Sequence, residues 1–133
     1  MAEMFSSPEG YERVMGRWSA ILAPLFVEFA GVQKGGRVID VGCGTGSMVQ
    51  AISTWDSTAR ITGIDPVQAF IDYCESRFGD PRIAFRRGSA LELPYPDGHF
   101  DHALSLPCVE ICCKGRCHPE QKHEKGRGRD REP

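Results

Sequence analysis

The chain has 133 residues, a formal net charge of −2, and 41% hydrophobic and 26% charged residues. This length suits a single domain with an ordinary core. The balanced charge argues against a polyanion binder, so no nucleic-acid partner is expected. The sequence has no apolar run of about 18 residues, and its start, MAEMFSSPEG, lacks the features of a secretory signal. We therefore expect a cytoplasmic protein with no membrane partner.

The N-terminal part predicts a loop followed by a helix. Residues 1–17 are polar and are interpreted as a loop, whereas apolar residues recur at helical spacing from residue 18 onward. Pro24 predicts a kink or a late start of this helix, and Gly31 suits its C-terminal cap, followed by a turn at 34–36. We expect Trp18 in the core and Arg17 in solvent. The apolar positions are Trp18, Ile21, Leu22, Leu25, Phe26 and Phe29.

The middle of the chain alternates between strand and helix patterns. The expected strands are 37–41, 59–65, 82–87 and 101–106, and the expected helices are 47–55 and 67–78. A loop rich in proline and glycine covers 93–100. This order predicts an α/β fold with a parallel sheet and right-handed crossovers.

The composition changes abruptly near the C-terminus. From Cys112 onward there is no Val, Ile, Leu, Met, Phe, Tyr or Trp, so this segment cannot bury enough surface to offset its ordering entropy. We predict a domain over residues 1–107 and a disordered tail over 108–133. The tail lacks paired C-x2-C spacing, so we expect adventitious metal binding and no dedicated metal site. Its candidate ligands are Cys108, Cys112, Cys113, Cys117, His118 and His123.

Alternating glycines follow the first expected strand in the stretch VIDVGCGTGS, residues 38–47. Glycines permit unusual backbone angles and close approach of a ligand, and a helix start offers free N–H groups and a positive dipole end. Asp65 ends the next strand, where a carboxylate can accept hydrogen bonds from a ribose diol. Together with Asp40, this pattern predicts a nucleoside-bearing ligand at the carboxyl ends of the first two strands. We interpret Cys43 as a small residue beneath the loop.

Alternatives remain open at this point. The dinucleotide fingerprint G-x-G-x-x-G requires its third glycine at position 47, where the chain has Ser47; this weakens the NAD interpretation. An NAD(P)-dependent oxidoreductase fragment and a non-catalytic remnant whose tail binds metal or a partner are the other candidates. The alternatives to a ligand site here are a tight strand-to-helix turn for the glycines and a turn or helix N-cap for Asp65. His99 and His102 are candidate proton-transfer groups, although most such histidines are structural.

The spacing D-x-G-x-G-x-G, from Asp40 to Gly46, resembles motif I of the class I S-adenosylmethionine-dependent methyltransferases. GIDP (63–66) resembles the end of strand two in that family, and RRGSALELPYPDGHFD (86–101) resembles the type-11, UbiE-like branch. YERVMGRWS (11–19) is similar to the N-terminal part of some members. The resemblance covers about residues 10–106.

This resemblance implies S-adenosyl-L-methionine as cofactor, a small-molecule methyl acceptor and a partial Rossmann-like sheet of about four strands with flanking helices. It places Asp40 near the amino end of the cofactor, the glycine loop at its carboxylate, Asp65 at the ribose, and Ser89 and Ala90 beside the adenine. It identifies no catalytic side chain. The cofactor-binding residues expected are Asp40, Gly42, Cys43, Gly44, Gly46, Asp65, Pro66, Ser89, Ala90 and Ser105.

The resemblance ends near Leu106, where family members continue with further helices and strands. We interpret this break as a shifted reading frame or a truncated domain, with the C-terminal half of the fold missing. The fourth strand would then form an exposed apolar edge of the sheet, through which the chain could self-associate.

Overall fold

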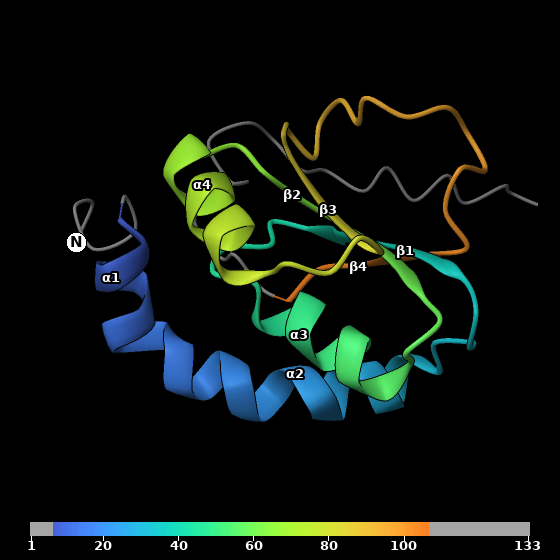
Figure 1. The fold of residues 1–133 in the computed structure, drawn as a ribbon, viewed down its shortest axis with the longest axis horizontal. Helices are drawn as coiled ribbons and strands as arrows, with labels where there is room; N and C mark the ends of the chain where they lie inside the picture. Colours follow the sequence, from blue (N-terminus) through green and yellow to red (C-terminus); the bar gives the residue numbers. More distant parts are fainter. Residues whose placement is uncertain (1–6, 107–133) are drawn as a thin grey trace, which may run out of the picture.

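The structure, a computed structural model, describes residues 7–106. Within this range four parallel strands form one sheet in the order β3-β2-β1-β4, with helices packed against it (Figure 1). The predicted α/β class and parallel sheet are confirmed. The predicted tail, 108–133, lies outside the described residues. The elements are α1 (Pro8–Tyr11), η2 (Glu12–Gly16), α2 (Arg17–Ala30), β1 (Arg37–Val41), α3 (Ser47–Trp55), β2 (Arg60–Asp65), α4 (Gln68–Arg77), β3 (Ile83–Arg87) and β4 (His102–Leu104).

The segment before α2 is helical from Pro8 onward, so the loop predicted for residues 1–17 is wrong over this part. The side chain of Ser7 accepts a hydrogen bond from the Gly10 N–H at 3.1 Å, and Pro8 lies at the start of α1. Serine before a helix and proline in its first turn are start signals. The π-helical turn η2 then joins α1 to α2 without a break.

Helix α2 turns its small residues inward. Its buried residues are Ser19, Ala23 and Val27, whereas Trp18 is 61% and Phe29 is 88% exposed. The prediction that Trp18 lies in the core is therefore wrong, because small side chains let α2 lie close against α3. The late start predicted from Pro24 does not occur, since the helix begins at Arg17. Gly31 caps its end in the left-handed conformation, with φ 61°, as predicted.

The order of the strands determines where a ligand site can form. The chain moves outward from β1 through β2 to β3 and then returns past β1 to pair β4 on the other side. Such a reversal opens a crevice at the carboxyl ends of the strands. The connection 88–101 makes this return on the side of the molecule away from α2 (Figure 1). β4 is an edge of the described sheet, as predicted, but is only three residues long.

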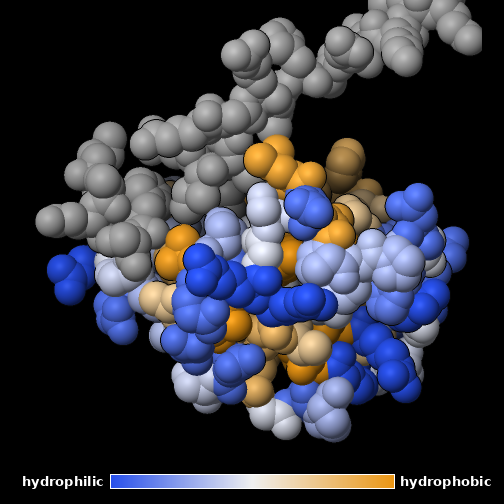
Figure 2. Space-filling view, turned by 90° about the horizontal axis from the view of Figure 1, so that it is seen from above, coloured by the Kyte–Doolittle hydropathy of each residue, from blue (hydrophilic) through white to orange (hydrophobic). Residues whose placement is uncertain are grey.

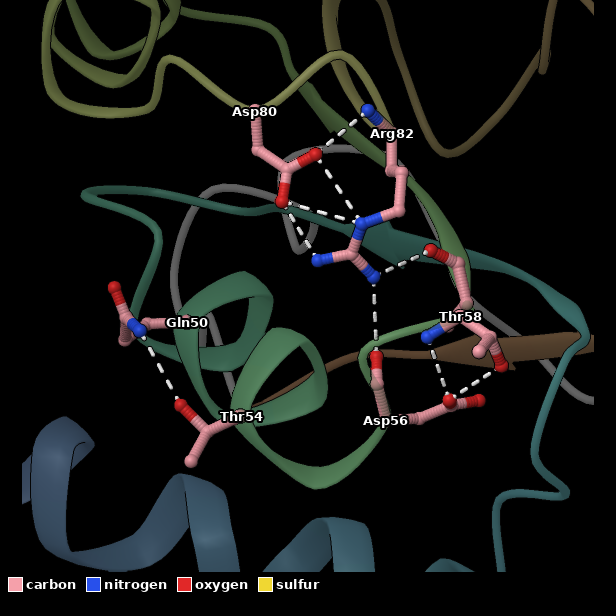
Figure 3. Close-up of polar contacts among 7 residues, drawn as sticks. Gln50, Thr54, Asp56, Thr58, Asp80 and Arg82 are labelled. Atoms are coloured by element: carbon pink, nitrogen blue, oxygen red, sulfur yellow. Dashed lines mark hydrogen bonds and ion pairs between the residues drawn. The ribbon is translucent and has the colours of Figure 1, made fainter.

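The opposite end of the sheet carries a polar network (Figure 3). Arg82 donates to the carbonyl oxygens of Asp56 and Ala59, both at 3.2 Å, and forms an ion pair with Asp80 at 2.6 Å. Hydrogen bonds from the Thr58 hydroxyl, the Gly35 N–H and the Thr58 N–H lower the pKa of Asp56 to about 2. The stabilisation from this ionised carboxylate is thus present near neutral pH and is lost as the pH falls below 4 toward 2. These contacts hold the loops before β2 and β3 in place.

Membrane insertion has no structural support in the part of the chain that is described. None of the helices between residues 7 and 106 has the length and apolar character needed to cross a bilayer.

Candidate functional site

The glycine loop between β1 and α3 requires its glycines for the backbone itself. Gly42, Gly44 and Gly46 have φ values of 76°, 52° and 90°, which side-chain-bearing residues rarely adopt. The N–H groups of Gly42 and Cys43 donate to the Ile64 carbonyl oxygen at 2.8 and 3.0 Å, so the loop is fixed to the end of β2. The tight turn weighed from the sequence is therefore present, and the ligand cradle stays a prediction.

Asp65 holds a turn before α4 in this structure. Its carboxylate accepts hydrogen bonds from the Gly44 N–H at 3.0 Å and from the Val67 N–H at 2.9 Å. Burial raises its pKa, and these two backbone hydrogen bonds oppose that change. The turn weighed from the sequence is thus present, whereas the N-cap of α4 is Val67. Each carboxylate oxygen has two acceptor positions, so the ribose contact stays a prediction.

Asp40 is the most unusual group of the site. It is 1% exposed, and neither of its carboxylate oxygens has a hydrogen-bond partner among residues 7–106. Burial first, and then the charge of Asp65, raise its pKa to about 7. Burying an ionised carboxylate without a hydrogen-bond partner costs free energy. Such groups are rare in native proteins and therefore call for an explanation. A cationic or hydrogen-donating ligand group would supply the missing partner.

Three residues beside Asp40 were missed by the sequence analysis. Asp40 lines a narrow cavity together with Tyr11, Ser19 and Thr45, and the buried Thr45 hydroxyl also lacks a partner within the described range. The Tyr11 ring lies 3.6 Å from the position that a Cβ on Gly44 would take. Thr45 lies between two glycines of the motif, and this position could have indicated that it belongs to the site. Tyr11 was missed because its segment was taken for a loop.

The remaining predicted cofactor residues lie at the same carboxyl ends of the strands. The Ser105 hydroxyl donates to the Val41 carbonyl oxygen at 2.9 Å, which ties the end of β4 to β1. The Pro66 carbonyl oxygen accepts from Arg87 Nε at 3.1 Å. The Ser89 hydroxyl accepts from the Leu91 N–H at 3.1 Å, and the neighbouring Ala90 is exposed. The structure does not test their contacts with a cofactor.

Helix α3 adds an anion-binding end to this site. Its N-cap is Gly46, and no side chain caps its first turn in the described part of the chain. The first N–H groups of a helix have no partners within the helix, and with the helix dipole they favour a negatively charged group. The site thus places a carboxylate-binding end beside a carboxylate that lacks a partner. This combination fits a ligand with one acidic and one basic end.

Other candidate reactive groups are not placed for chemistry. A hydrogen bond with the Cys74 thiol, followed by burial, raises the pKa of Cys43, so Cys43 stays a thiol beneath the loop. His102 Nε2 accepts from the Gln33 N–H at 3.2 Å, and the His99 ring stacks on Tyr95 with 5.3 Å between centroids. Residues 7–106 hold no cluster of three metal-binding side chains. The cysteines and histidines of the tail lie outside the described residues.

Comparisons with known proteins point to one family. The profile described as "Methyltransferase domain" matches residues 38–118. The fatty-acid O-methyltransferase of Mycolicibacterium smegmatis is 34% identical over 73 residues, which cover 55% of this chain and 27% of that protein. The chain spans about a quarter to a third of the length of the curated relatives it matches.

Solved structures share the fold. A candidate S-adenosyl-L-methionine-dependent methyltransferase from Methanococcus maripaludis aligns with a TM-score of 0.65 at 18% identity, over 79% of this chain and 52% of that one. The [4+2]-cyclase SpnF aligns with a TM-score of 0.56 at 33% identity, over 63% of this chain and 32% of that one. The same architecture therefore occurs in proteins that are named for different reactions.

Proposed function

Because the chain belongs to the methyltransferase-domain family, we propose that it binds S-adenosylmethionine at the glycine loop and serves methyl transfer to a small molecule. The observation that carries this proposal is the buried, unpartnered carboxylate of Asp40 at the end of β1. S-adenosylmethionine has a cationic amino group and a carboxylate at one end and a ribose diol in its middle. These groups match the acceptors and donors that the site offers.

Several residues of the site have a stated role in this proposal. Asp40 accepts a hydrogen bond from the amino group, and the N–H groups at the start of α3 hold the carboxylate. Asp65, which already positions Gly44, accepts from the ribose hydroxyls. Ser89 and Ala90 lie beside the adenine on the exposed connection after β3. Thr45 offers its buried hydroxyl to the same end of the cofactor as Asp40.

The chemistry of the cofactor requires little from the protein in the way of acid or base catalysis. S-adenosylmethionine carries its methyl group on a sulfonium, which is a good leaving group for attack by a nucleophilic acceptor. The protein contributes by holding the reactants in line and by excluding water. We assign no catalytic side chain, and the small-molecule acceptor is not specified by the described residues.

The direct test is a calorimetric titration of the 133-residue chain with S-adenosylhomocysteine, S-adenosylmethionine and NADH. We expect saturable binding of the two adenosyl ligands and none of NADH. Binding of NADH alone would favour the oxidoreductase alternative, and binding of none of the three would overturn the assignment of the site. Methyl transfer is then measured with labelled S-adenosylmethionine and a mixture of small-molecule acceptors.

We predict that Asp65→Ala weakens binding of S-adenosylhomocysteine at least about tenfold, because each hydrogen bond to a charged acceptor contributes about 1.5–3 kcal/mol. The same change also removes the hydrogen bonds to the Gly44 and Val67 N–H groups, so affinity by itself does not identify a ribose contact. The measurement is therefore repeated with the 2′-deoxy analogue of the ligand. The wild type should prefer the ribose form, and the variant should lose this preference. An equal preference in both proteins would leave Asp65 with a structural role only.

A further inference from the structure

Helix α2 carries an apolar stripe on its outer face. We define the stripe as five residues that lie on one face of the helix, and each is at least 47% exposed. Spacings of three and four residues place them on the same side of the helix. Exposed apolar groups of this size usually mark an interaction surface. The members of the stripe are Trp18, Ile21, Leu22, Leu25 and Phe29.

The stripe is not part of the site described above. The inner face of α2 packs on α3 through its buried small residues, and the stripe points away from them. On the opposite side of the molecule, hydrophobic residues lie in several places among hydrophilic ones (Figure 2).

We propose that the stripe is the interface of a homodimer in which two copies of α2 pack antiparallel about a two-fold axis. Trp18 and Phe29 are 11 residues apart, which is close to three full helical turns and about 16 Å along the axis. In an antiparallel pair, Trp18 of one copy therefore lies against Phe29 of the other, twice. The leucines in the middle of the stripe pack near the axis. An interface of this kind uses the same surface on both copies.

The charges beside the stripe complement each other only in this arrangement. Arg17 and Glu28 are also 11 residues apart, so they lie on the same flank of the stripe, one near each end. Both are exposed, and neither forms an ion pair within residues 7–106. Antiparallel packing brings Arg17 of one copy toward Glu28 of the other at both ends of the interface. Parallel packing about a two-fold axis would place the two copies of this flank on opposite sides of the interface, so Arg17 and Glu28 would not meet.

The stripe supplies part of the surface that such a pair needs. A standard interface takes about 800 Å² from each partner, and the exposed Trp18 and Phe29 are large contributors to it. A groove of about 400 Å³ lies on the same flank as Arg17 and Glu28 and is lined mainly by residues of α2 and α3. Ala20 and Pro24 form its α2 side. The groove extends the surface available to the second copy.

The test is sedimentation equilibrium of the full 133-residue chain at protein concentrations from about 1 to about 200 µM, because dimerisation depends on concentration. We expect a reversible monomer–dimer equilibrium that Leu25→Glu shifts to the monomer, with at least about a tenfold higher dissociation constant. Leu91→Glu is the matched control, because Leu91 is 73% exposed and lies outside α2; it should leave the equilibrium unchanged. Circular dichroism of both variants checks that they fold.

A charge exchange distinguishes a second copy from any other occupant. Arg17→Glu or Glu28→Arg singly should weaken the dimer, and the double exchange in one chain should restore it, because both ends then regain opposite charges. A wild type that stays monomeric at 200 µM would overturn the proposal, as would a Leu25→Glu variant that dimerises normally or a double exchange that fails to restore the dimer. A monomer that binds phosphatidylcholine vesicles through the stripe would assign the surface to lipid and would overturn it too.

Discussion

Replacing Asp40 with asparagine is expected to weaken cofactor binding and, at the same time, to stabilise the free protein. At pH 8 the Asp40 carboxylate is largely ionised, because its pKa is about 7, and it is buried with no partner in residues 7–106. Asparagine removes this uncompensated charge but keeps the shape. We expect the free energy of unfolding at pH 8 to rise by about 1–3 kcal/mol. Affinity for S-adenosylhomocysteine should fall about ten- to a hundredfold, because a charged acceptor is lost.

The pH dependence of the wild type supplies the control for this prediction. The folded pKa of Asp40, about 7, lies above its ordinary value of 3.8, so the folded state binds more protons between these values. Stability of the free protein should therefore decrease as the pH rises from 4 toward 7. Ligand affinity should change in the opposite direction and fall as the pH drops from 7.5 to 5.5. Chemical denaturation and calorimetry measure the two quantities, and both trends should be weaker in the asparagine variant, in which the raised pKa of Asp65 remains. A variant that binds as tightly as the wild type would contradict the proposed contact.

Replacing Gly46 with alanine is expected to destabilise the protein more than the same change at Gly44, where the nearest atom to an added Cβ lies 3.6 Å away. The backbone at Gly46 has φ +90°, and a Cβ there would lie 2.6 Å from Cε2 of the Phe78 ring and 3.3 Å from Cys74 Sγ. The Phe78 ring is itself held against Phe85, with 5.4 Å between centroids. Backbone strain and overpacking each cost about 1–3 kcal/mol. We expect a loss of about 2–5 kcal/mol in the free energy of unfolding, measured by urea denaturation.

Two matched glycine variants separate the causes. Gly98 has a positive φ of 72° but nothing within 4 Å of an added Cβ, so Gly98→Ala should show the backbone cost alone, about 1 kcal/mol. Gly79 has neither a positive φ nor a close neighbour, and Gly79→Ala should be nearly neutral. If the Gly46 variant were no less stable than the Gly98 variant, the contact with Phe78 would not be the reason for glycine at that position.

Much of the scaffold was predictable because local patterns agreed with the final packing. The helix over residues 47–55 and the four strands follow from short-range periodicity, and the turn signals are local. The role of the alternating glycines in the backbone was also predictable from the local sequence, because the turn itself requires their left-handed conformations. The position of Asp65 at the end of a strand was readable for the same reason, although a sequence does not show which donors such an acid meets.

The sequence by itself determined the four strands, the helices between them and the parallel sheet, because each depends on spacing along the chain. Only the tertiary structure decided which face of α2 is buried. Periodicity shows that an apolar face exists, but close packing on α3 selected Ser19, Ala23 and Val27 and left Trp18 in solvent. The tertiary structure also decided that Asp40 has no partner within the described residues while Asp65 has two. Burial and hydrogen bonding depend on residues that are distant in sequence. The residues next to an aspartate therefore do not predict how deeply it is buried or which groups donate hydrogen bonds to it.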